Sequence, residues 1–378
     1  MPDLGIIQTA LDRAVTEGVF PGAVLAVRCG DRPISRFCAG LLSTVPPGSP
    51  VSTSTIYDLA SLTKPLATVT ALVLLMQKGS CRLDDRVADH LPECADVSIG
   101  SAMIRHLLTH SSGLPGWRGF YERLSPIGVI PSSAEEREQA KQTMLSLIRF
   151  EAPVYERGTR SLYSDLGFIL LGLIVERSSG QSMSDYFLNH IVGPLGGPRI
   201  GFLLPERLHA FSDDVDGNVG EVAPTEVDRW RGHLLCGEVH DQNAAALGGE
   251  AGHAGLFGTA DAVLAISGEW LRAYHDQATI LDQAMVQEFA QRQKSDGSSS
   301  WALGWDTPSV PSSAGRYFAA RSFGHLGYTG TSVWIDPVRK LEVVLLSNRV
   351  HPSSRNEAIK EFRPAIHDLV YQEFIGSI

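Results

Sequence analysis

The sequence is poor in lysine and in net positive charge. Only six of its 32 basic residues are lysines, which leaves 26 arginines, and 42 acidic residues give a formal net charge of −10. Nucleic acids and anionic membranes are bound through clustered basic charge that displaces counterions. The composition therefore indicates no nucleic-acid partner and no membrane partner, and the acidity is typical of a well-solvated surface.

The sequence also lacks features that direct a chain out of the cytoplasm. Residues 1–18 show no basic stretch followed by an apolar run and a small-residue cleavage site, which a secretory signal requires. The most apolar run, 65-PLATVTALVLLM-76, is shorter than the roughly 18 residues of a membrane span. Five cysteines without a CxxC pair indicate reduced, mostly buried thiols rather than a disulfide framework. We expect a cytoplasmic protein.

Matching patterns of strand and helix occur at the two ends of the chain. Helical apolar spacing is found at 5–18 and 355–374, and strand patterns are found at 22–28, 33–40, 331–336 and 341–348. Such ends are most simply joined in one antiparallel β-sheet that is flanked by the two terminal helices. The chain opens and closes in one α/β (α+β) lobe.

Between these ends the pattern becomes helical. Helices are predicted at 65–78, 101–109, 134–150 and 165–178. With 378 residues and 43% hydrophobic content the chain can bury two lobes. We expect a discontinuous α/β lobe formed by 1–60 and 255–378. The inserted lobe, 61–254, is mainly helical; it includes a loop at 206–255 that forms the rim of an active site in the cleft between the lobes.

A serine and a lysine three residues apart stand at the start of an apolar run, in 58-DLASLTKPLATV-69. Positions i and i+3 share one face of a helix, so Ser61 and Lys64 can touch, and Pro65 favours a helix start near Ser61 or Leu62. The N–H groups of a first turn can hold an oxyanion, and a desolvated lysine can act as a base. Ser-x-x-Lys also arises by chance in a chain of this length. Lys64 is, however, the only lysine with a serine three residues before it, and arginine cannot act as a base.

A second cluster of reactive side chains is 159-TRSLYSDLGFILLG-172. Tyr163 and Ser164 precede a helix that Ser164 or Asp165 can cap. A tyrosine at such a turn can shuttle a proton if a nearby cation lowers its pKa. The alternative is a tyrosine that only packs against the helix start.

A third segment, 323-FGHLGYTGTSVWIDP-337, is rich in glycine and runs into a strand that we expect at the edge of the sheet. Glycines let the backbone approach a ligand, and a strand edge offers unpaired N–H groups. His325 can bind a carboxylate or a carbonyl group of a substrate. Taken alone, the segment is equally well a bulged strand.

The motifs 61-SLTK-64, 163-YSD-165 and 325-HLG-327 resemble, in order and spacing, the three active-site motifs of the serine β-lactamase and penicillin-binding protein superfamily. The chain is most similar to the branch of class C β-lactamases, family VIII carboxylesterases and D-alanyl-D-alanine peptidase-like proteins, in which a tyrosine leads the second motif. The stretches 106-HLLTHSSGLPGW-117 and 251-AGHAGLFGTADAVLAIS-267 also resemble that branch. The resemblance covers nearly the whole chain.

This resemblance implies a serine hydrolase that works through an acyl-enzyme. It implies Ser61 as the nucleophile, Lys64 and Tyr163 as the pair that removes and returns its proton, and the backbone N–H groups of Ser61 and Tyr328 as the oxyanion hole. The residues that we expect to bind substrate are Asp165, His240, His253, His325 and Gly327.

Two residues depart from the β-lactamase pattern. Asp165 stands where an asparagine is usual, and it adds an acceptor or a negative charge unless it only caps the helix. His325 stands where lactamases carry the lysine that attracts a β-lactam carboxylate. A histidine is largely uncharged near neutral pH, so efficient β-lactamase action is disfavoured.

The loop 236–255 gathers His240, Asp241, Asn243 and His253. Their spacing matches no metal-ligand pattern and the serine mechanism needs no metal, so we expect neither a metal nor another cofactor. Hydrogen bonds that structure the loop are expected instead, with substrate contacts from the two histidines. Several aromatic residues can either line an apolar pocket or pack in the core, namely Trp117, Tyr121, Trp301 and Trp305.

We therefore expect a carboxylesterase-like serine hydrolase of small esters or amides, because no export signal gives access to the cell wall and His325 weakens a carboxylate anchor. One alternative keeps the site and changes the substrate to D-amino-acid peptides or β-lactams, as in a D-alanyl-D-alanine peptidase, a D-aminopeptidase or a β-lactamase. Another is a non-catalytic binding or assembly protein on the same fold, which the intact Ser61, Lys64 and Tyr163 disfavour. The oligomeric state is left open.

Overall fold

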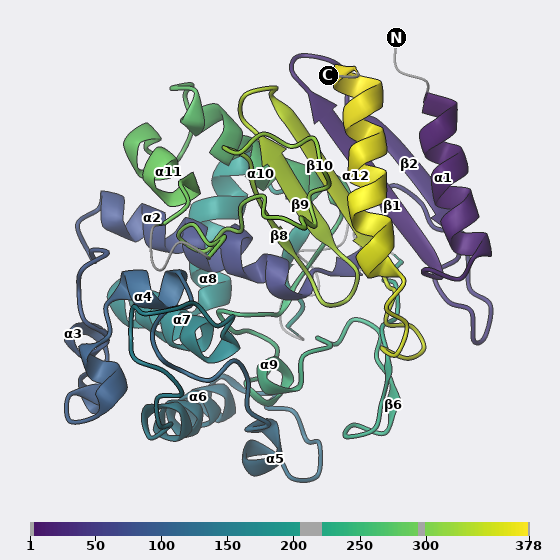
Figure 1. Ribbon diagram of the computed structural model, residues 1–378. Coiled ribbons are helices and arrows are strands. Elements are labelled where there is room, and N and C mark those ends of the chain that lie inside the picture. Colours follow the sequence, from purple (N-terminus) through teal and green to yellow (C-terminus); the bar gives the residue numbers. More distant parts are fainter. Residues whose placement is uncertain (1–3, 205–220, 294–298, 377–378) are drawn as a thin grey trace.

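A five-stranded antiparallel sheet joins the two ends of the chain (Figure 1). The computed structural model describes residues 4–204, 221–293 and 299–376. The sheet has the strand order β2-β1-β10-β9-β8, and its strands are β1 Gly22–Cys29, β2 Ser35–Gly40, β8 Phe323–Leu326, β9 Ser332–Asp336 and β10 Leu341–Ser347. The first strand of the chain thus pairs with the last, with Leu25 opposite Leu345.

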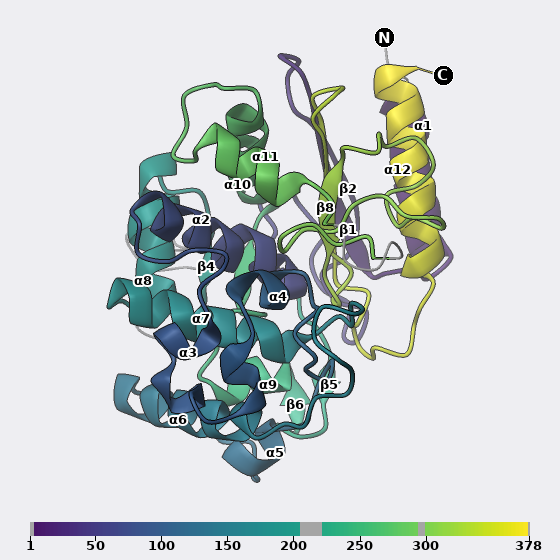
Figure 2. The ribbon, with the colours of Figure 1, turned by 60° about the vertical axis from the view of Figure 1, so that its left-hand side comes forward.

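Both faces of this sheet are covered. The helices α1, Leu4–Thr16, and α12, Ile359–Ile375, lie side by side over one face (Figures 1 and 2), where they pack on alternate strand residues such as Leu25 and Val343. The intervening residues belong to a second core cluster, on the face that α10, Ala260–Tyr274, covers. The predicted sheet covered by the two terminal helices is confirmed.

The last helix begins later than the sequence predicts, at Ile359 rather than at residue 355. Nη1 of Arg349 binds the backbone carbonyl groups of Ser354 (3.0 Å) and Asn356 (2.8 Å). Oδ1 of Asn356 accepts a hydrogen bond from the N–H group of Ala358 (3.0 Å), and such a local side-chain bond competes with helix formation, so these residues stay outside α12.

The middle of the chain is mainly helical and lies to the left of the sheet and below it in the view of Figure 2. Its α-helices are α2 Thr70–Gln77, α3 Val87–His90, α4 Ile104–Leu108, α5 Tyr121–Leu124, α6 Ala134–Arg149, α7 Asp165–Ser179, α8 Met183–Phe187 and α9 Gln242–Ala246, and α11 Gln283–Ala290 follows α10. Four of its short helices are η3 Pro92–Cys94, η4 Ser98–Ser101, η5 Leu188–Val192 and η6 Gly193–Leu195. The short strands are β3 Tyr57–Asp58, β4 Ile200–Phe202, β5 Val227–Asp228, β6 His233–Leu234 and β7 Leu256–Gly258.

One apolar core connects this helical part to the sheet. The same cluster contains Val24 and Val344 of the sheet and Leu72 and Phe168 of the helices. The predicted lobe boundaries at 60/61 and 254/255 stay a prediction. Of the predicted rim loop at 206–255, residues 206–220 lie outside the described part of the chain.

The helix that carries Ser61 begins differently from the predicted α-helix. It starts with a 3-10 turn, η1 Ala60–Leu62, continues as a π-helix, η2 Lys64–Val69, and only then becomes α2. Pro65 is the physical reason, because it lacks an N–H group and its ring clashes with the carbonyl group four residues earlier. The wider π turn closes with a bond from the N–H of Thr70 to the carbonyl oxygen of Pro65.

Burial accounts for two features of the sequence. The helical stretch Ala60–Gln77 is long and apolar enough to span a membrane by length and composition alone, but 89% of it is buried inside the fold, which identifies it as a core helix. The five cysteines are free thiols, and Cys29, Cys81 and Cys94 are buried.

Two glycines bring α7 against the segment that precedes β7. A Cβ atom on Gly172 would lie 2.8 Å from the backbone nitrogen of Gly252, and a Cβ atom on Gly252 would lie 2.2 Å from the carbonyl oxygen of Phe168. Neither contact is possible for a residue with a side chain. The hydroxyl of Thr68 in η2 donates to the carbonyl oxygen of Gly252 (2.7 Å), so α7 meets this segment backbone to backbone and η2 binds it through a side chain.

Replacing Gly172 with alanine should lower the free energy of unfolding by about 1–3 kcal/mol, because the new methyl group must push α7 away from Gly252. Gly167→Ala on the same helix is the matched control. Its Cβ atom would meet Leu107 at an ordinary 3.6 Å, and alanine is favoured over glycine in a helix by about 1 kcal/mol. Urea unfolding of both variants measures the difference, and equal stabilities would contradict the backbone contact.

Candidate active site

Ser61 lies in η1, and its hydroxyl contacts the side chain of Lys64. Lys64 is completely buried. Its Nζ atom donates hydrogen bonds to Oγ of Ser61 (3.0 Å), to Oδ1 of Asp165 (2.7 Å) and to the backbone oxygen of His253 (3.0 Å). An ammonium group has three N–H bonds, so each of them has an acceptor. The acceptors come from η1, from the first residue of α7 and from the segment before β7.

The turn between β8 and β9 is tied to the residues that precede η1. The hydroxyl of Thr329 donates to the carbonyl oxygen of Asp58 (2.7 Å), and that of Thr331 donates to the carbonyl oxygen of Leu59 (3.1 Å). Gly327 packs so closely here that a Cβ atom would lie 2.7 Å from the oxygen of Leu59. The third sequence motif therefore lies against the first.

Two backbone N–H groups at this junction, those of Ser61 and Tyr328, have no hydrogen-bond acceptor within the described residues. The N–H group of the preceding Ala60 is taken by the carboxylate of Asp58 (2.8 Å). Ala60 has φ +47°, a left-handed value that is uncommon for a residue with a side chain. The pair predicted as an oxyanion hole is thus unoccupied by protein groups, and its catalytic role stays a prediction.

Tyr163 stands just before α7 among three other rings. Its ring centroid lies 4.6 Å from that of His110, 5.5 Å from that of Trp301 and 6.1 Å from that of His325. The Nζ atom of Lys64 lies 4.9 Å from the same centroid. All three sequence motifs therefore meet around Ser61 and Tyr163.

The structure decides between the two roles that the sequence leaves open for Asp165. Ser164 caps α7, because its Oγ accepts a hydrogen bond from the N–H group of Gly167 (3.3 Å). The carboxylate of Asp165 pairs with Lys64 instead. The N–H group of Ser164 donates to Nδ1 of His110 (3.1 Å), which fixes the backbone next to Tyr163.

Opposing influences set the pKa values of the two proton-exchanging groups. Burial lowers the pKa of Lys64, but the Asp165 carboxylate and Tyr163 raise it, and the result lies above the ordinary value. The pKa of Tyr163 is also raised, by burial first, against the lowering effect of the Lys64 ammonium group. Both groups therefore hold their protons in the resting site near neutral pH.

His325 of β8 is neutral in this environment. Its Nδ1 atom donates to the carbonyl oxygen of Leu326 (2.8 Å), so Nε2 is the acceptor nitrogen of the ring. Nε2 is buried and has no partner in the described part of the chain. Burial, followed by the charge of Lys64, lowers the pKa of His325 to about 3. No permanent positive charge stands at this position, as the sequence indicates.

His240 and His253 bind carboxylates in or next to their own loop. Nε2 of His240 lies 2.9 Å from Oε2 of Glu226, and Nε2 of His253 lies 2.8 Å from Oδ1 of Asp241. The ring of His240 also faces that of Tyr328, with 5.5 Å between centroids. These are the predicted loop-structuring bonds, and contact with substrate stays a prediction. Over the described ranges, no group of three or more His, Cys, Asp or Glu side chains is arranged to hold a metal ion.

Sequence reasoning missed two residues that hold the site together. His110 is buried with φ +55° and supports Tyr163 and its neighbour. His110 lies in the stretch 106–117 that resembles the family, but no spacing within this stretch distinguishes His110 from His106. Asp58 binds the N–H group of His240 (2.6 Å) as well as that of Ala60. The sequence offers one signal for Asp58, namely that an acidic residue stands three positions before Ser61.

The four aromatic residues named from the sequence have different environments. Trp301 faces the site through its contacts with Tyr163 and His325. Trp305 is completely buried against Trp270 and Phe323 and belongs to the core. The other two lie next to each other outside the core, with 6.3 Å between their ring centroids, namely Trp117 and Tyr121.

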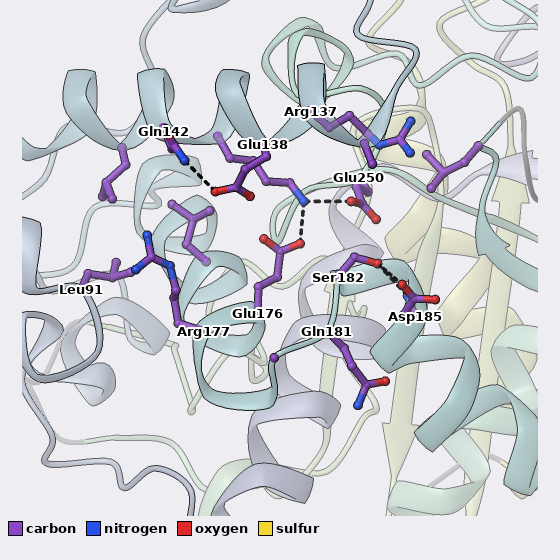
Figure 3. Close-up of a pocket in the computed structure, with 16 residues that line it drawn as sticks. Leu91, Arg137, Glu138, Gln142, Glu176, Arg177, Gln181, Ser182, Asp185 and Glu250 are labelled. Atoms are coloured by element: carbon purple, nitrogen blue, oxygen red, sulfur yellow. Dashed lines mark hydrogen bonds and ion pairs between the residues drawn. The ribbon is translucent and has the colours of Figure 1, made fainter.

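A second buried lysine anchors the segment that supplies the His253 carbonyl group. Nζ of Lys141 binds Oε1 of Glu176 (2.6 Å) and Oε1 of Glu250 (2.8 Å). Figure 3 shows these two carboxylates on the wall of a pocket of about 550 Å³, turned toward the same ammonium group. The segment from Glu250 to His253 is therefore held by one lysine at each end, Lys141 and Lys64.

A family model and curated relatives match most of the chain. The family model described as Beta-lactamase matches residues 7–364. A protein of Escherichia coli (strain K12) named "Putative D-alanyl-D-alanine carboxypeptidase" is 32% identical over 318 residues, which cover 79% of this chain and 70% of that protein. The Bacillus subtilis (strain 168) protein named "N-acetylmuramyl-L-alanine amidase" is 30% identical over 376 residues, which cover 91% and 80%.

A solved structure supports the fold. EstCE1, described as a hydrolase with promiscuous acyltransferase activity, superimposes with a TM-score of 0.72 over 97% of each chain, at 23% sequence identity. At this identity the likeness concerns the fold alone. Together with the match over residues 7–364, the geometry around Ser61 leads to one conclusion. The chain belongs to the Beta-lactamase family of serine hydrolases.

Proposed function

We propose that the protein hydrolyses small uncharged esters or amides through an acyl-enzyme on Ser61. The observation that carries this proposal is the 3.0 Å contact between Oγ of Ser61 and the buried Nζ of Lys64. Tyr163 and the unpaired N–H groups of Ser61 and Tyr328 adjoin this contact. A serine in this setting has a proton-exchanging partner, a nearby positive charge and donors for an oxyanion.

The reaction would proceed in two acyl transfers. Oγ of Ser61 attacks the carbonyl carbon while its proton passes to the pair of Lys64 and Tyr163. The carbonyl oxygen becomes negative and is held by the N–H groups of Ser61 and Tyr328, where one such donor contributes about 3 kcal/mol to the transition state. The alcohol or amine leaves with the returned proton, and water then releases the acid by the same steps.

The charges around Ser61 support a neutral substrate. His325 is uncharged, and the Lys64 ammonium group is already paired with Asp165. Arg349 stacks on the ring of Tyr328 at 4.4 Å, and its Nε atom donates to the backbone oxygen of the same residue (2.8 Å). A substrate carboxylate must therefore compete for cations that already have partners, whereas an uncharged acyl group meets no such cost.

Peptidase activity on D-amino-acid substrates is the second candidate, because the Escherichia coli relative carries a carboxypeptidase name. A carboxypeptidase substrate ends in a carboxylate, which neutral His325 does not attract. An aminopeptidase substrate needs no carboxylate anchor, so the neutral His325 does not disfavour it. Within this candidate the site therefore supports an aminopeptidase better than a carboxypeptidase. Faster hydrolysis of a chromogenic cephalosporin than of p-nitrophenyl butyrate would instead favour β-lactamase action.

Ser61→Ala should lower the hydrolysis of p-nitrophenyl butyrate at least about 10³-fold, because the group that forms the acyl-enzyme is lost. A fluorophosphonate probe should label the wild-type protein and leave this variant unlabelled. Ser54→Ala, at an exposed serine, is the control and should behave as wild type. Full activity in Ser61→Ala would exclude the mechanism, and an unlabelled wild-type protein without turnover on ester and peptide panels would favour a non-catalytic protein.

The preference for a neutral acyl group can be measured with a matched pair of esters, p-nitrophenyl butyrate and mono-p-nitrophenyl succinate. In the wild-type protein the ratio of their kcat/KM values should favour the neutral ester and stay constant between pH 6 and 8, because His325, with a pKa of about 3, does not titrate there. His325→Lys should shift the ratio toward the acidic ester by about tenfold, or about 1.4 kcal/mol.

His325→Gln is the control for losing the imidazole ring without adding a charge. It should leave the ratio close to that of the wild-type protein. A wild-type ratio that moves toward the acidic ester as the pH falls from 8 to 6 would mean that His325 becomes protonated, and the argument for neutral substrates would then be wrong.

A further inference from the structure

Lys64 can accept a proton only if Nζ carries a lone pair, and its surroundings favour the form that has none. Three oxygen atoms accept hydrogen bonds from Nζ, those of a hydroxyl, a carboxylate and a backbone carbonyl group, and the phenol of Tyr163 lies next to them. A neutral amine has only two N–H bonds and would turn its lone pair toward one of these oxygens, whereas an ammonium group satisfies all three. The described site is thus complementary to a charged Lys64.

Asp165 provides the counter-charge that stabilises the buried ammonium group of Lys64. Its carboxylate makes the shortest of the three contacts, 2.7 Å, and is itself only slightly exposed. A buried ammonium group without a counter-charge is strongly disfavoured. The asparagine that is usual at this position of the β-lactamase pattern could supply an oxygen acceptor, but it carries no charge.

The other charged or titratable groups near Lys64 do not replace Asp165. Asp241 is bound to His253 (2.8 Å). His110 and His325 are neutral, because burial and then the charge of Lys64 lower their pKa values. Tyr163 holds its proton. Asp165 is the carboxylate in direct contact with Nζ.

We propose that Asp165 is a positioning residue that fixes Lys64 as an ammonium ion, so that Lys64 acts on Ser61 as a hydrogen-bond donor while Tyr163 exchanges the proton. This role rests on the proposed acyl-enzyme function and divides the work of the Lys64 and Tyr163 pair. Substrate binding by Asp165, which the sequence predicts, stays a prediction; the proposal concerns the contact of its carboxylate with Lys64.

The acylation step then needs no proton transfer to Lys64. The bond between Oγ of Ser61 and the acyl carbon forms as the Oγ–H proton moves to the phenolic oxygen of Tyr163. The phenolic proton of Tyr163 moves to the leaving oxygen as the bond between that oxygen and the acyl carbon breaks, and the electron pair of this bond departs with the oxygen. Lys64 keeps its three protons and stabilises the negative charge that develops on Oγ.

Asp165→Asn tests this role through the pH dependence of the reaction. The wild-type rate should persist at alkaline pH until Lys64 or Tyr163 loses its proton. Because the variant lacks the charge that raises the pKa of Lys64, its alkaline limb should lie about 1–3 pH units lower, with KM little changed. Two measurements between pH 5 and 11 report the position of the alkaline limb: kcat/KM for p-nitrophenyl butyrate, and the rate at which a fluorophosphonate labels Ser61.

Two further variants control for folding and for the loss of an ion pair. Asp165→Glu keeps the carboxylate and should restore most of the alkaline limb. Glu93→Gln removes a carboxylate that pairs with Arg177 of the same helix (2.8 Å) and with neither buried lysine, and should leave both limbs in place. Circular dichroism of each variant reports the fold, and Asp165→Glu keeps the test decisive if Asp165→Asn does not fold.

Other results for Asp165→Asn would assign a different role to Lys64 or to Asp165. A faster reaction of Asp165→Asn near pH 7, with the acidic limb moved down, would mean that Lys64 is the base and would overturn the proposal. Limbs that do not move, or a change in KM alone, would overturn it in favour of a structural or substrate-binding Asp165. If no ester or amide is turned over, the proposed function fails, and the labelling rates still decide the role of Asp165.

Discussion

Burial of one ammonium group, that of Lys64, is the constraint on which the candidate active site depends. A charge removed from water costs several kcal/mol unless protein groups replace the lost hydrogen bonds. The three replacements come from η1, from the start of α7 and from the carbonyl group of His253. These segments must therefore meet at one point, and the contacts that stabilise the charge are the same contacts that hold the Ser61 hydroxyl.

The segment from Glu250 to His253 shows how this requirement extends away from Ser61. Its close approach to α7 needs the absence of side chains at Gly172 and Gly252. Lys141 binds its first residue and Lys64 binds its last. Because α7 also provides Asp165 and Glu176, one carboxylate for each lysine, a single helix aligns both anchors. Displacement of this segment would remove one acceptor from the buried charge.

The sequence predicted the sheet and the meeting of Ser61, Lys64 and Tyr163, because these follow from strand and helix patterns and from motifs in a known order. It did not predict the 3-10 and π turns around Ser61, whose geometry follows from the steric effect of Pro65 within a packed helix. His110 was missed because its role depends on a left-handed backbone and on partners about 54 residues away. Such contacts are set by tertiary packing, which local spacing does not report.

The two departures from the β-lactamase pattern have one electrostatic effect. A lysine at position 325 would place a second cation near Lys64 and would lower its pKa, whereas His325 is neutral. An asparagine at position 165 would add no charge, whereas Asp165 raises the pKa of Lys64. Both differences therefore favour the charged form of Lys64. They also leave the substrate side of the site without a free cation at His325, which is the observation on which the proposed preference for uncharged acyl groups rests.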